Sequence, residues 1–483
     1  MNKPYKTFSC QIHFSLSFDK VMVKILIIGA GAAGIAAANR LSENRFTNFT
    51  ILEAENRVGG RIYSVKFGNA FVDLGAEFCH GENIIYDLVR KYNLLKPTEM
   101  IFPQLCHSSK ELVRQDIADE LFKAFYTIYM APKQENQSFG SYFDQKYREI
   151  VTAHFQDKSH CKGLALESFD LFKKWVTSYE GSFSWYTPTI VSDYQICKGN
   201  HLMTWQGNGC GSLLKVLTKK YPAIEDKIIL NKEVTDIIWD QDEAVVKCQD
   251  GSRYTADHVI VTVSLGVLKE KHQSLFYPPL PNNKETIIRK LGMDSIHQIF
   301  FQFPRRWWPV SEFIGFSFLW DEEGMDDLKR NNADKFWVKD LIGLFCVDQN
   351  PNVLEAWFSG EFIPTIESLS EEIIIEGIMF VIEKFLKDRF VDIPRPNGFI
   401  RHNWYSNPHF RGGYSHQTIK SRESSTEIGM SEPNILAEPL CTSSGKPMVL
   451  FAGEATHPIY YSVLHGAIET GFREADRIIA YYK

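Results

Sequence analysis

A glycine-rich segment near the N-terminus constrains the fold of this chain more than any other feature. Residues 25–34 read ILIIGAGAAG, and Gly29, Gly31 and Gly34 supply the spacing Gly-x-Gly-x-x-Gly after an apolar run. A tight turn, close backbone approach to a pyrophosphate and close helix–strand packing each exclude a side chain at such positions. The segment therefore predicts a strand, a phosphate-binding turn and a helix over 32–42, whose first N–H groups face the phosphates.

The next segment extends this unit into a dinucleotide site. A second predicted strand, residues 49–52, ends at Glu53. This acid lies about 20 residues past the turn, where a carboxylate would bind ribose hydroxyls. Residues 57–61 then read RVGGR. Two glycines permit backbone contact with the cofactor, and Arg57 and Arg61 can reach phosphate or carbonyl oxygens. This combination favours FAD over NAD.

The run from GAGAAG through Glu53 to RVGGR resembles the flavin-containing amine oxidase family. Within that family the resemblance is greatest to animal spermine oxidases and N1-acetylpolyamine oxidases. Matching motifs continue along most of the chain: DLGAEFCHG at 73–81, ADHVIVTVSLGVLK at 256–269, NPHFRGGYS at 407–415, LFAGEATH at 450–457 and YYSVLHGAIETG at 460–471.

The resemblance implies an FAD site with defined roles. Glu454 would bind the ribityl–phosphate region, Val234 would contact the adenine side through its backbone, and the last helix, opened by Gly466 and Ala467, would face the flavin ring. Tyr414 stands where monoamine oxidases attach FAD to a cysteine, so non-covalent FAD is expected. The full expected cofactor set is Gly29, Gly31, Ala33, Gly34, Glu53, Arg57, Gly60, Arg61, Val234, Gly453, Glu454, Gly466 and Ala467.

The substrate side is also implied by the resemblance. His80 matches the histidine of the family's WIHG segment and would hydrogen-bond a substrate nitrogen or keep it neutral. Phe410, Tyr460 and Tyr461 fall where the family builds an aromatic wall beside the flavin. The alternative for the histidine is an ordinary loop position, and for the aromatic residues it is core packing.

Two departures from the family pattern affect the chemistry. The family lysine that holds a water against flavin N5 falls on Gln298, and a glutamine brings neither charge nor base. Val463 stands where animal polyamine oxidases tend to have threonine and others tyrosine, so a substrate hydrogen bond would be lost. Ser264 replaces a proline, which is a milder change.

The chain of 483 residues exceeds the usual size of a single core. We expect an α/β fold in which a discontinuous Rossmann-like FAD-binding domain carries an inserted α+β substrate domain. Trp307 and Trp308 follow a predicted strand and are expected at the domain interface. The expected segments are 22–92, 207–285 and 405–483 for FAD, 93–206 and 286–404 for substrate, and an N-terminal extension at 1–21.

Composition excludes several other classes. A net charge of −6 gives no indication of nucleic acid or an anionic membrane as a partner. The apolar stretch 21–38 contains Lys24 and the glycine turn, so it is interpreted as strand, turn and helix and not as a membrane span. The nine cysteines form no Cys-x-x-Cys pair, which favours reduced thiols and no metal site. We expect a monomer or weak dimer in the cytoplasm, with no peroxisomal Ser-Lys-Leu ending.

The resemblance implies oxidation of a polyamine or acetylated polyamine, with O2 as the electron acceptor and H2O2 as a product. Because of Gln298, an FAD-binding protein without oxidase activity remains the main alternative. A third alternative is an oxidase of amino acids or monoamines, although Arg289, Arg305 and Arg306 lie in no carboxylate-clamp motif of the family. A histone demethylase is less favoured, because no inserted helical tower is evident.

Overall fold

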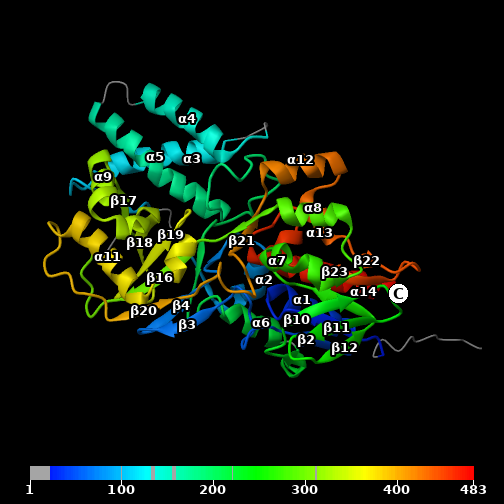
Figure 1. Cartoon of the computed structure of the whole chain (residues 1–483). Coiled ribbons are helices and arrows are strands. Elements are labelled where there is room, and N and C mark those ends of the chain that lie inside the picture. Colours follow the sequence, from blue (N-terminus) through cyan, green and yellow to red (C-terminus); the bar gives the residue numbers. More distant parts are fainter. Residues whose placement is uncertain (1–21, 99–100, 132–135, 155–158, 220, 311–312) are drawn as a thin grey trace, which may run out of the picture.

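The structure is a computed structural model (Figure 1) that describes residues 22–98, 101–131, 136–154, 159–219, 221–310 and 313–483. The expected extension at 1–21 lies outside the described residues. Two large sheets occupy separate halves of the molecule, each covered by helices, which confirms the expected mixed α/β architecture. The exact limits of the two expected domains stay predictions.

The first large sheet is built from three distant parts of the chain. Its order is β22-β23-β13-β1-β2-β9, and all its pairings are parallel except that of β22 with β23. All four residues of the central strand β1 are buried, so the apolar run before the glycine turn is explained by burial on both faces. The strands are β22 (Leu440–Cys441), β23 (Pro447–Phe451), β13 (His258–Val261), β1 (Ile25–Ile28), β2 (Phe49–Leu52) and β9 (Ile228–Ile229).

Two helices pack tightly beside this sheet, α1 (Ala32–Glu43) and α14 (Leu464–Tyr481). The contact depends on small residues: a Cβ on Gly471 would lie 2.2 Å from the carbonyl oxygen of Ala33. The chain's C-terminal helix is thereby held against the helix that follows the glycine turn.

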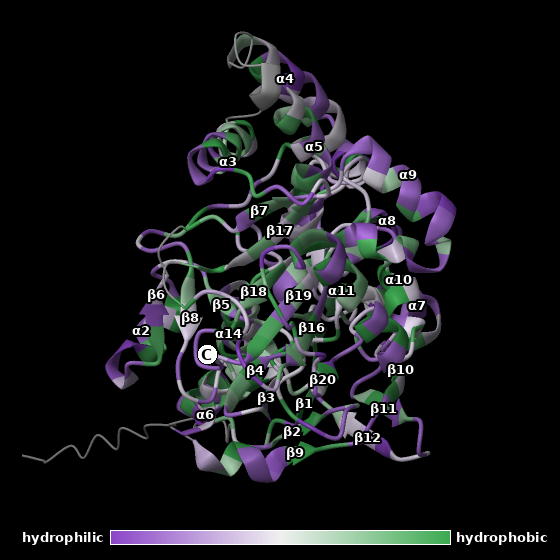
Figure 2. Ribbon diagram, turned by 90° about the vertical axis from the view of Figure 1, so that its left-hand side faces the viewer, coloured by the Kyte–Doolittle hydropathy of each residue, from purple (hydrophilic) through white to green (hydrophobic). Residues whose placement is uncertain are grey.

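The second large sheet has the order β20-β16-β19-β18-β17-β7 and is antiparallel except for the β17–β7 pair. Helix α11 (Glu371–Leu386) covers one face, and α3 (Gln115–Tyr129), α4 (Phe139–His154) and α5 (Ser159–Glu180) cover the other. In Figure 2 outer helices such as α4 and α9 carry much hydrophilic colour, whereas green gathers on interior strands. The strands are β20 (Gly398–Arg401), β16 (His297–Gln302), β19 (Val353–Phe358), β18 (Leu341–Cys346), β17 (Gly315–Leu319) and β7 (Gln104–His107).

Smaller elements complete the fold. Within the described residues, four small sheets comprise β12 (Arg253–Ala256), β11 (Ala244–Cys248), β10 (Val234–Ile238) and β14 (Phe276–Tyr277); β5 (Phe78–Cys79), β8 (Met203–Trp205) and β6 (Leu95–Pro97); β3 (Ser64–Phe67) and β4 (Ala70–Asp73); and β15 (Gly292–Asp294) and β21 (Tyr414–His416). The other α-helices are α2 (Ile84–Val89), α6 (Ser212–Lys219), α7 (Leu265–Leu275), α8 (Asn282–Lys290), α9 (Glu322–Asn331), α10 (Ile363–Ser368), α12 (Ile419–Ile428) and α13 (Glu432–Ala437). Among the described helices, we find none whose length and hydropathy would let it cross a bilayer.

The expectation for Trp307 and Trp308 was wrong. Both indoles are buried in the core between the second large sheet and α11, where the Trp307 ring stacks on Phe316 at 5.9 Å and also contacts Phe390. The loop after β16 turns its large apolar side chains back over its own sheet, because burying them there removes more apolar surface from water than a position at the rim.

Candidate active site

The glycine turn after β1 has the close contacts that its spacing predicts. Gly29 adopts a φ of 105°, and a Cβ there would lie 2.4 Å from Thr262 Oγ1. A Cβ on Gly34 would lie 2.0 Å from the carbonyl oxygen of Gly29. Gly31 is the N-cap of α1 and has no side chain to cap the helix, so the first N–H groups remain available for a phosphate.

Glu53 is a buried part of this turn. One of its carboxylate oxygens accepts the backbone N–H of Ala30 at 2.6 Å, and the other accepts that of Glu55 at 2.8 Å. Burial raises the pKa of Glu53, while these two N–H donors act against that rise. Each oxygen retains a further lone pair, which fits the expected bond to a ribose hydroxyl.

The RVGGR loop lies directly against the glycine turn. Gly59 donates its N–H to the carbonyl of Ala30 at 2.9 Å, and a Cβ on Gly60 would lie 3.2 Å from the Cα of Gly31. Arg57 turns inward: it donates to the carbonyl of Gly60 at 2.8 Å, and its guanidinium lies 4.0 Å from the centre of the Tyr63 ring. In this structure Arg57 therefore binds carbonyl oxygens and holds the shape of its own loop.

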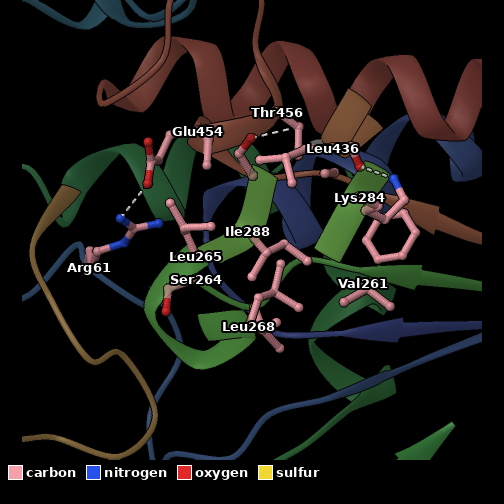
Figure 3. Close-up of a pocket in the computed structure, with 15 residues that line it drawn as sticks. Arg61, Val261, Ser264, Leu265, Leu268, Lys284, Ile288, Leu436, Glu454 and Thr456 are labelled. Carbon is pink, nitrogen blue, oxygen red and sulfur yellow. Dashed lines mark hydrogen bonds and ion pairs between the residues drawn. The ribbon is translucent and has the colours of Figure 1, made fainter. Parts of the chain in front are cut away.

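Arg61 and Glu454 join distant segments (Figure 3). Arg61 Nη1 donates to a Glu454 carboxylate oxygen and to the carbonyl of Gly413, both at 2.8 Å. The other Glu454 oxygen accepts the Ser415 hydroxyl at 2.6 Å and the Ser462 N–H at 2.8 Å. Glu454 thus fixes the relative positions of three motifs, and its expected contact with the cofactor stays a prediction.

The pocket in Figure 3 lies beside this ion pair, and Gly453 contributes to its wall. Lys284 also lines it: its ammonium donates to the carbonyls of Ile435 and Leu436 at 2.7 and 2.8 Å, at the end of α13. Burial lowers the pKa of Lys284 to about 7. Val234, expected at the adenine side, is a half-buried residue of β10.

The last helix begins at Leu464, two residues before the expected start at Gly466. Gly466 and Ala467 lie in its first turn, where a Cβ on Gly466 would meet the carbonyl oxygen of Tyr460 at 1.8 Å. Val463 is the N-cap and provides no side-chain hydrogen bond. No N-cap side chain therefore occupies the first N–H groups of α14. These groups remain available to stabilise a negative charge.

His80 lies in the short segment after β5. Burial, and next the neighbouring His201, lower the pKa of His80 to about 4, so its imidazole is neutral at pH 7. Asn83 accounts for part of its placement: the amide donates to the His80 carbonyl at 3.1 Å and lies 3.4 Å from His465 Nδ1 in α14. The expected histidine is thus linked to the start of the last helix through Asn83, a residue that was not among those expected from the sequence.

The three expected aromatic wall residues lie in different surroundings. Phe410 is buried and packs edge-on against Trp404, with ring centres 5.0 Å apart. Tyr460 is half-buried and contacts the rings of His457 and His465 at 5.1 and 4.7 Å. Tyr461 is buried, and its hydroxyl is hydrogen-bonded to Ser192.

Gln298 is buried between two carboxyl groups. Its Nε2 donates to Glu355 at 2.7 Å and to Glu77 at 3.1 Å. Glu355 comes from β19, which pairs with β16, and Glu77 from the segment between β4 and β5. Neither acid was expected from the sequence, although a single acid within the apolar strand VLEAWF was an available signal, because buried acids are rare unless paired.

The chain belongs to the family of flavin-containing amine oxidoreductases, whose model matches residues 32–479. It therefore binds FAD and is an oxidoreductase acting on CH–NH donors. The residues present fit this cofactor, since the turn excludes side chains, Glu53 is fixed by two N–H groups and two helices begin without side-chain caps.

Its curated relatives include polyamine oxidases. The chain is 28% identical to the peroxisomal N(1)-acetyl-spermine/spermidine oxidase of Bos taurus, with 94% of each chain covered, and 28% identical to that of Homo sapiens, with 95% covered. It is also 28% identical to probable polyamine oxidase 5 of Arabidopsis thaliana, over 95% of this chain and 98% of the relative.

Proposed function

We propose that the protein oxidises a polyamine or an N-acetylated polyamine. The observation that carries this proposal is the neutral, largely buried His80, which lies in the same short segment as Glu77, the hydrogen-bond partner of Gln298. A neutral imidazole can accept a hydrogen bond from an amine without repelling its positive charge. The similarity to named polyamine oxidases over nearly the whole chain supports the same substrate class.

The glycine turn, Glu53 and the start of α14 would hold FAD, and the chemistry it would supply is acceptance of a hydride equivalent from the amine α-carbon at N5 and transfer of two electrons to O2 to give H2O2. Water would hydrolyse the imine product to an aldehyde and a shorter amine. The chain's residues prepare this step. His80 orients the reacting nitrogen, Tyr460 provides an aromatic face beside it, and Val463 leaves this side of the pocket apolar. The uncapped start of α14 stabilises negative charge that develops at its end.

FAD is held without a covalent bond in this proposal. The hydroxyl of Tyr414, at the position of the attachment cysteine in monoamine oxidases, donates to the carbonyl of Ser178, so this side chain is already engaged with the protein. Acid precipitation should leave all the FAD in the supernatant. Flavin retained in the washed pellet would contradict this point.

The principal alternative is an FAD-binding protein without oxidase activity. It is favoured by Gln298, whose Nε2 already donates to two carboxyl groups and so has no hydrogen left for a water. An oxidase of a different amine is the other alternative.

Anaerobic mixing separates these alternatives. The purified yellow protein is mixed with spermine, spermidine, their N1-acetyl forms and simple monoamines, and the visible flavin absorbance is followed. Bleaching by a polyamine supports the proposal, and admission of air then tests O2 as the acceptor. Flavin that dithionite reduces but no amine bleaches would contradict it. Bleaching by monoamines alone would point to another amine oxidase.

Two properties complete the proposal. We propose a cytoplasmic location, in contrast to the peroxisomal names of two relatives, and a monomer or weak dimer. Imaging of the tagged full chain in cells tests the first, and sedimentation over a concentration series tests the second. Peroxisomal signal or a stable tetramer would contradict them.

A further inference from the structure

One amide nitrogen joins two acids in this protein. Gln298 Nε2 carries two hydrogens and donates to Glu355 at 2.7 Å and to Glu77 at 3.1 Å. Both carboxyl groups therefore lie within 3.1 Å of the same atom, although they come from different parts of the fold. We call Glu77, Gln298 and Glu355 the carboxyl–amide triad.

The triad lies next to the FAD-binding motifs. The segment that carries Glu77 is fixed to the RVGGR loop, because Ala76 donates its N–H to the carbonyl of Arg61 at 3.1 Å. A Cβ on Gly75 would lie 2.1 Å from the same carbonyl oxygen, so the two segments touch backbone to backbone. Glu355 is buried, whereas Glu77 keeps partial exposure, so Glu77 is the triad member that a bound molecule can reach.

The charges around the triad favour retention of a proton. Two acids so close together cannot both ionise cheaply when water is excluded. Burial is the main cause that raises the pKa of both, to about 8 for Glu355, and repulsion by Glu355 adds to the rise at Glu77. The other charged groups that act on them are Asp73 and Asp348, which are also acids and push the pKa values in the same direction.

We propose that the carboxyl–amide triad receives the ammonium proton of the incoming amine, with Glu77 as the acceptor and with Gln298 and Glu355 as positioning residues. The inference rests on the proposed amine oxidation and deepens it. In this step one N–H bond of the ammonium breaks, its electron pair stays on nitrogen, and one O–H bond forms on the carboxylate. No electrons are transferred, and the neutral amine is the form that can then lose a hydride equivalent.

The acceptor is suited to this task by its raised basicity. An ordinary carboxylate is too weak a base to take a proton from an alkylammonium, whereas a base whose pKa lies near the working pH is both available and effective. A lysine at position 298 would form ion pairs with both acids and lower their pKa values. Gln298 gives Glu77 and Glu355 no counter-charge, so these carboxyl groups, and not residue 298, would act as the base.

The test uses the FAD-loaded protein and four variants: Glu77→Gln, Glu355→Gln, Gln298→Lys, and Glu361→Gln as an exposed control on the surface. Stopped-flow measurement of anaerobic flavin reduction by the best polyamine is repeated across pH. We expect the wild type to slow as the pH is lowered, because Glu77 becomes protonated at a higher pH than an ordinary carboxyl group. We expect Glu77→Gln to be slower by about 100-fold, a typical effect for loss of a general base. The slowing at low pH should disappear in Glu77→Gln and move to lower pH in Gln298→Lys, while Glu361→Gln matches the wild type.

A second readout needs no substrate. Infrared difference titration of the oxidised protein should show a protonated carboxyl band at pH 7 that is lost as pH rises through about 8, and Glu355→Gln should remove it. If an amine reduces the flavin of Glu77→Gln with the same pH profile as the wild type, the inference is overturned but the proposed function is not. Absence of the band in wild type would also overturn it. If no amine reduces the wild-type flavin, the proposed function and the inference both fail.

Discussion

At the scale of single residues, close contacts within the cofactor-binding turn exclude side chains at its glycine positions. Gly34 faces the carbonyl oxygen of Gly29, and Gly29 faces Thr262 Oγ1, so neither tolerates a side chain. Glu53 then closes the turn by accepting the N–H of Ala30. These are short-range requirements, which is why the sequence spacing alone predicts them.

Gly34→Ala tests this requirement. The added methyl group would lie 2.0 Å from the Gly29 carbonyl oxygen, so the turn must shift. We expect a loss of about 1–3 kcal/mol in the free energy of unfolding and a marked fall in FAD content, measured by urea denaturation and flavin absorbance. Gly163→Ala is the control, since a Cβ there meets nothing within 4 Å. Equal FAD content in both variants would contradict the account.

His258 provides a residue-scale test of pH dependence. It is fully buried, it is hydrogen-bonded to the carbonyl of Pro447 and to Tyr482, and burial lowers its pKa to about 4. Because the unfolded chain binds this proton more tightly, the stabilisation is complete above pH 6.5 and is lost as pH falls towards 4.

Lowering the pH from 6.5 to 5 should therefore cost about 2 kcal/mol at His258 alone. Urea unfolding of His258→Gln should show a pH dependence that is weaker by that amount. If wild type and variant lost stability in parallel between these two pH values, His258 would not be the group responsible.

At the scale of elements, the start of α14 lacks a side-chain cap. An N-cap with extended backbone usually carries Ser, Thr, Asp or Asn, but Val463 provides no hydrogen bond. The open N–H groups are suited to a partner from outside the helix.

Val463→Thr tests this interpretation. A threonine oxygen at the N-cap should stabilise the protein by about 1 kcal/mol in the FAD-free form, measured by urea denaturation. The FAD-loaded form should gain less, because the added oxygen competes with the negative charge that the helix start accommodates. Val463→Ala controls for the lost methyl groups. An equal gain in both forms would show that the helix start does not face the cofactor.

At the scale of the whole molecule, Glu454 connects the separate motifs. Its two oxygens hold Arg61, Ser415 and the backbone of Ser462, and the side chain is almost fully buried. Breaking a buried ion pair by removing one charge is costly, since the other charge is left without its partner.

Glu454→Gln should therefore lower the free energy of unfolding by about 3 kcal/mol and weaken FAD binding, measured by urea denaturation and by flavin release on dilution. Glu372→Gln removes an exposed partner of Arg395 and should change both quantities little. A variant as stable as the wild type would show that Glu454 does not hold the three segments together.

The predictable parts of the protein are those set by local periodicity. The helix expected over 32–42 is found at Ala32–Glu43, and the strand expected over 49–52 is found at Phe49–Leu52. The predicted position of Trp307 and the predicted first residue of α14 were wrong. Sequence spacing does not show which neighbours bury a ring or at which residue a helix begins.

The glycine turn, the acid that closes it, the FAD-type motifs and the family resemblance can all be predicted from the sequence, because each depends on residue types at short, fixed spacings. The surroundings of Gln298 cannot, because they form only when distant segments fold together. Its two carboxyl partners lie 221 and 57 residues away along the chain, and β16, β19 and the segment after β4 had to meet before they could share one amide nitrogen. Burial then decided the proton affinity of these acids, since the free energy of a buried charge depends on all the atoms around it.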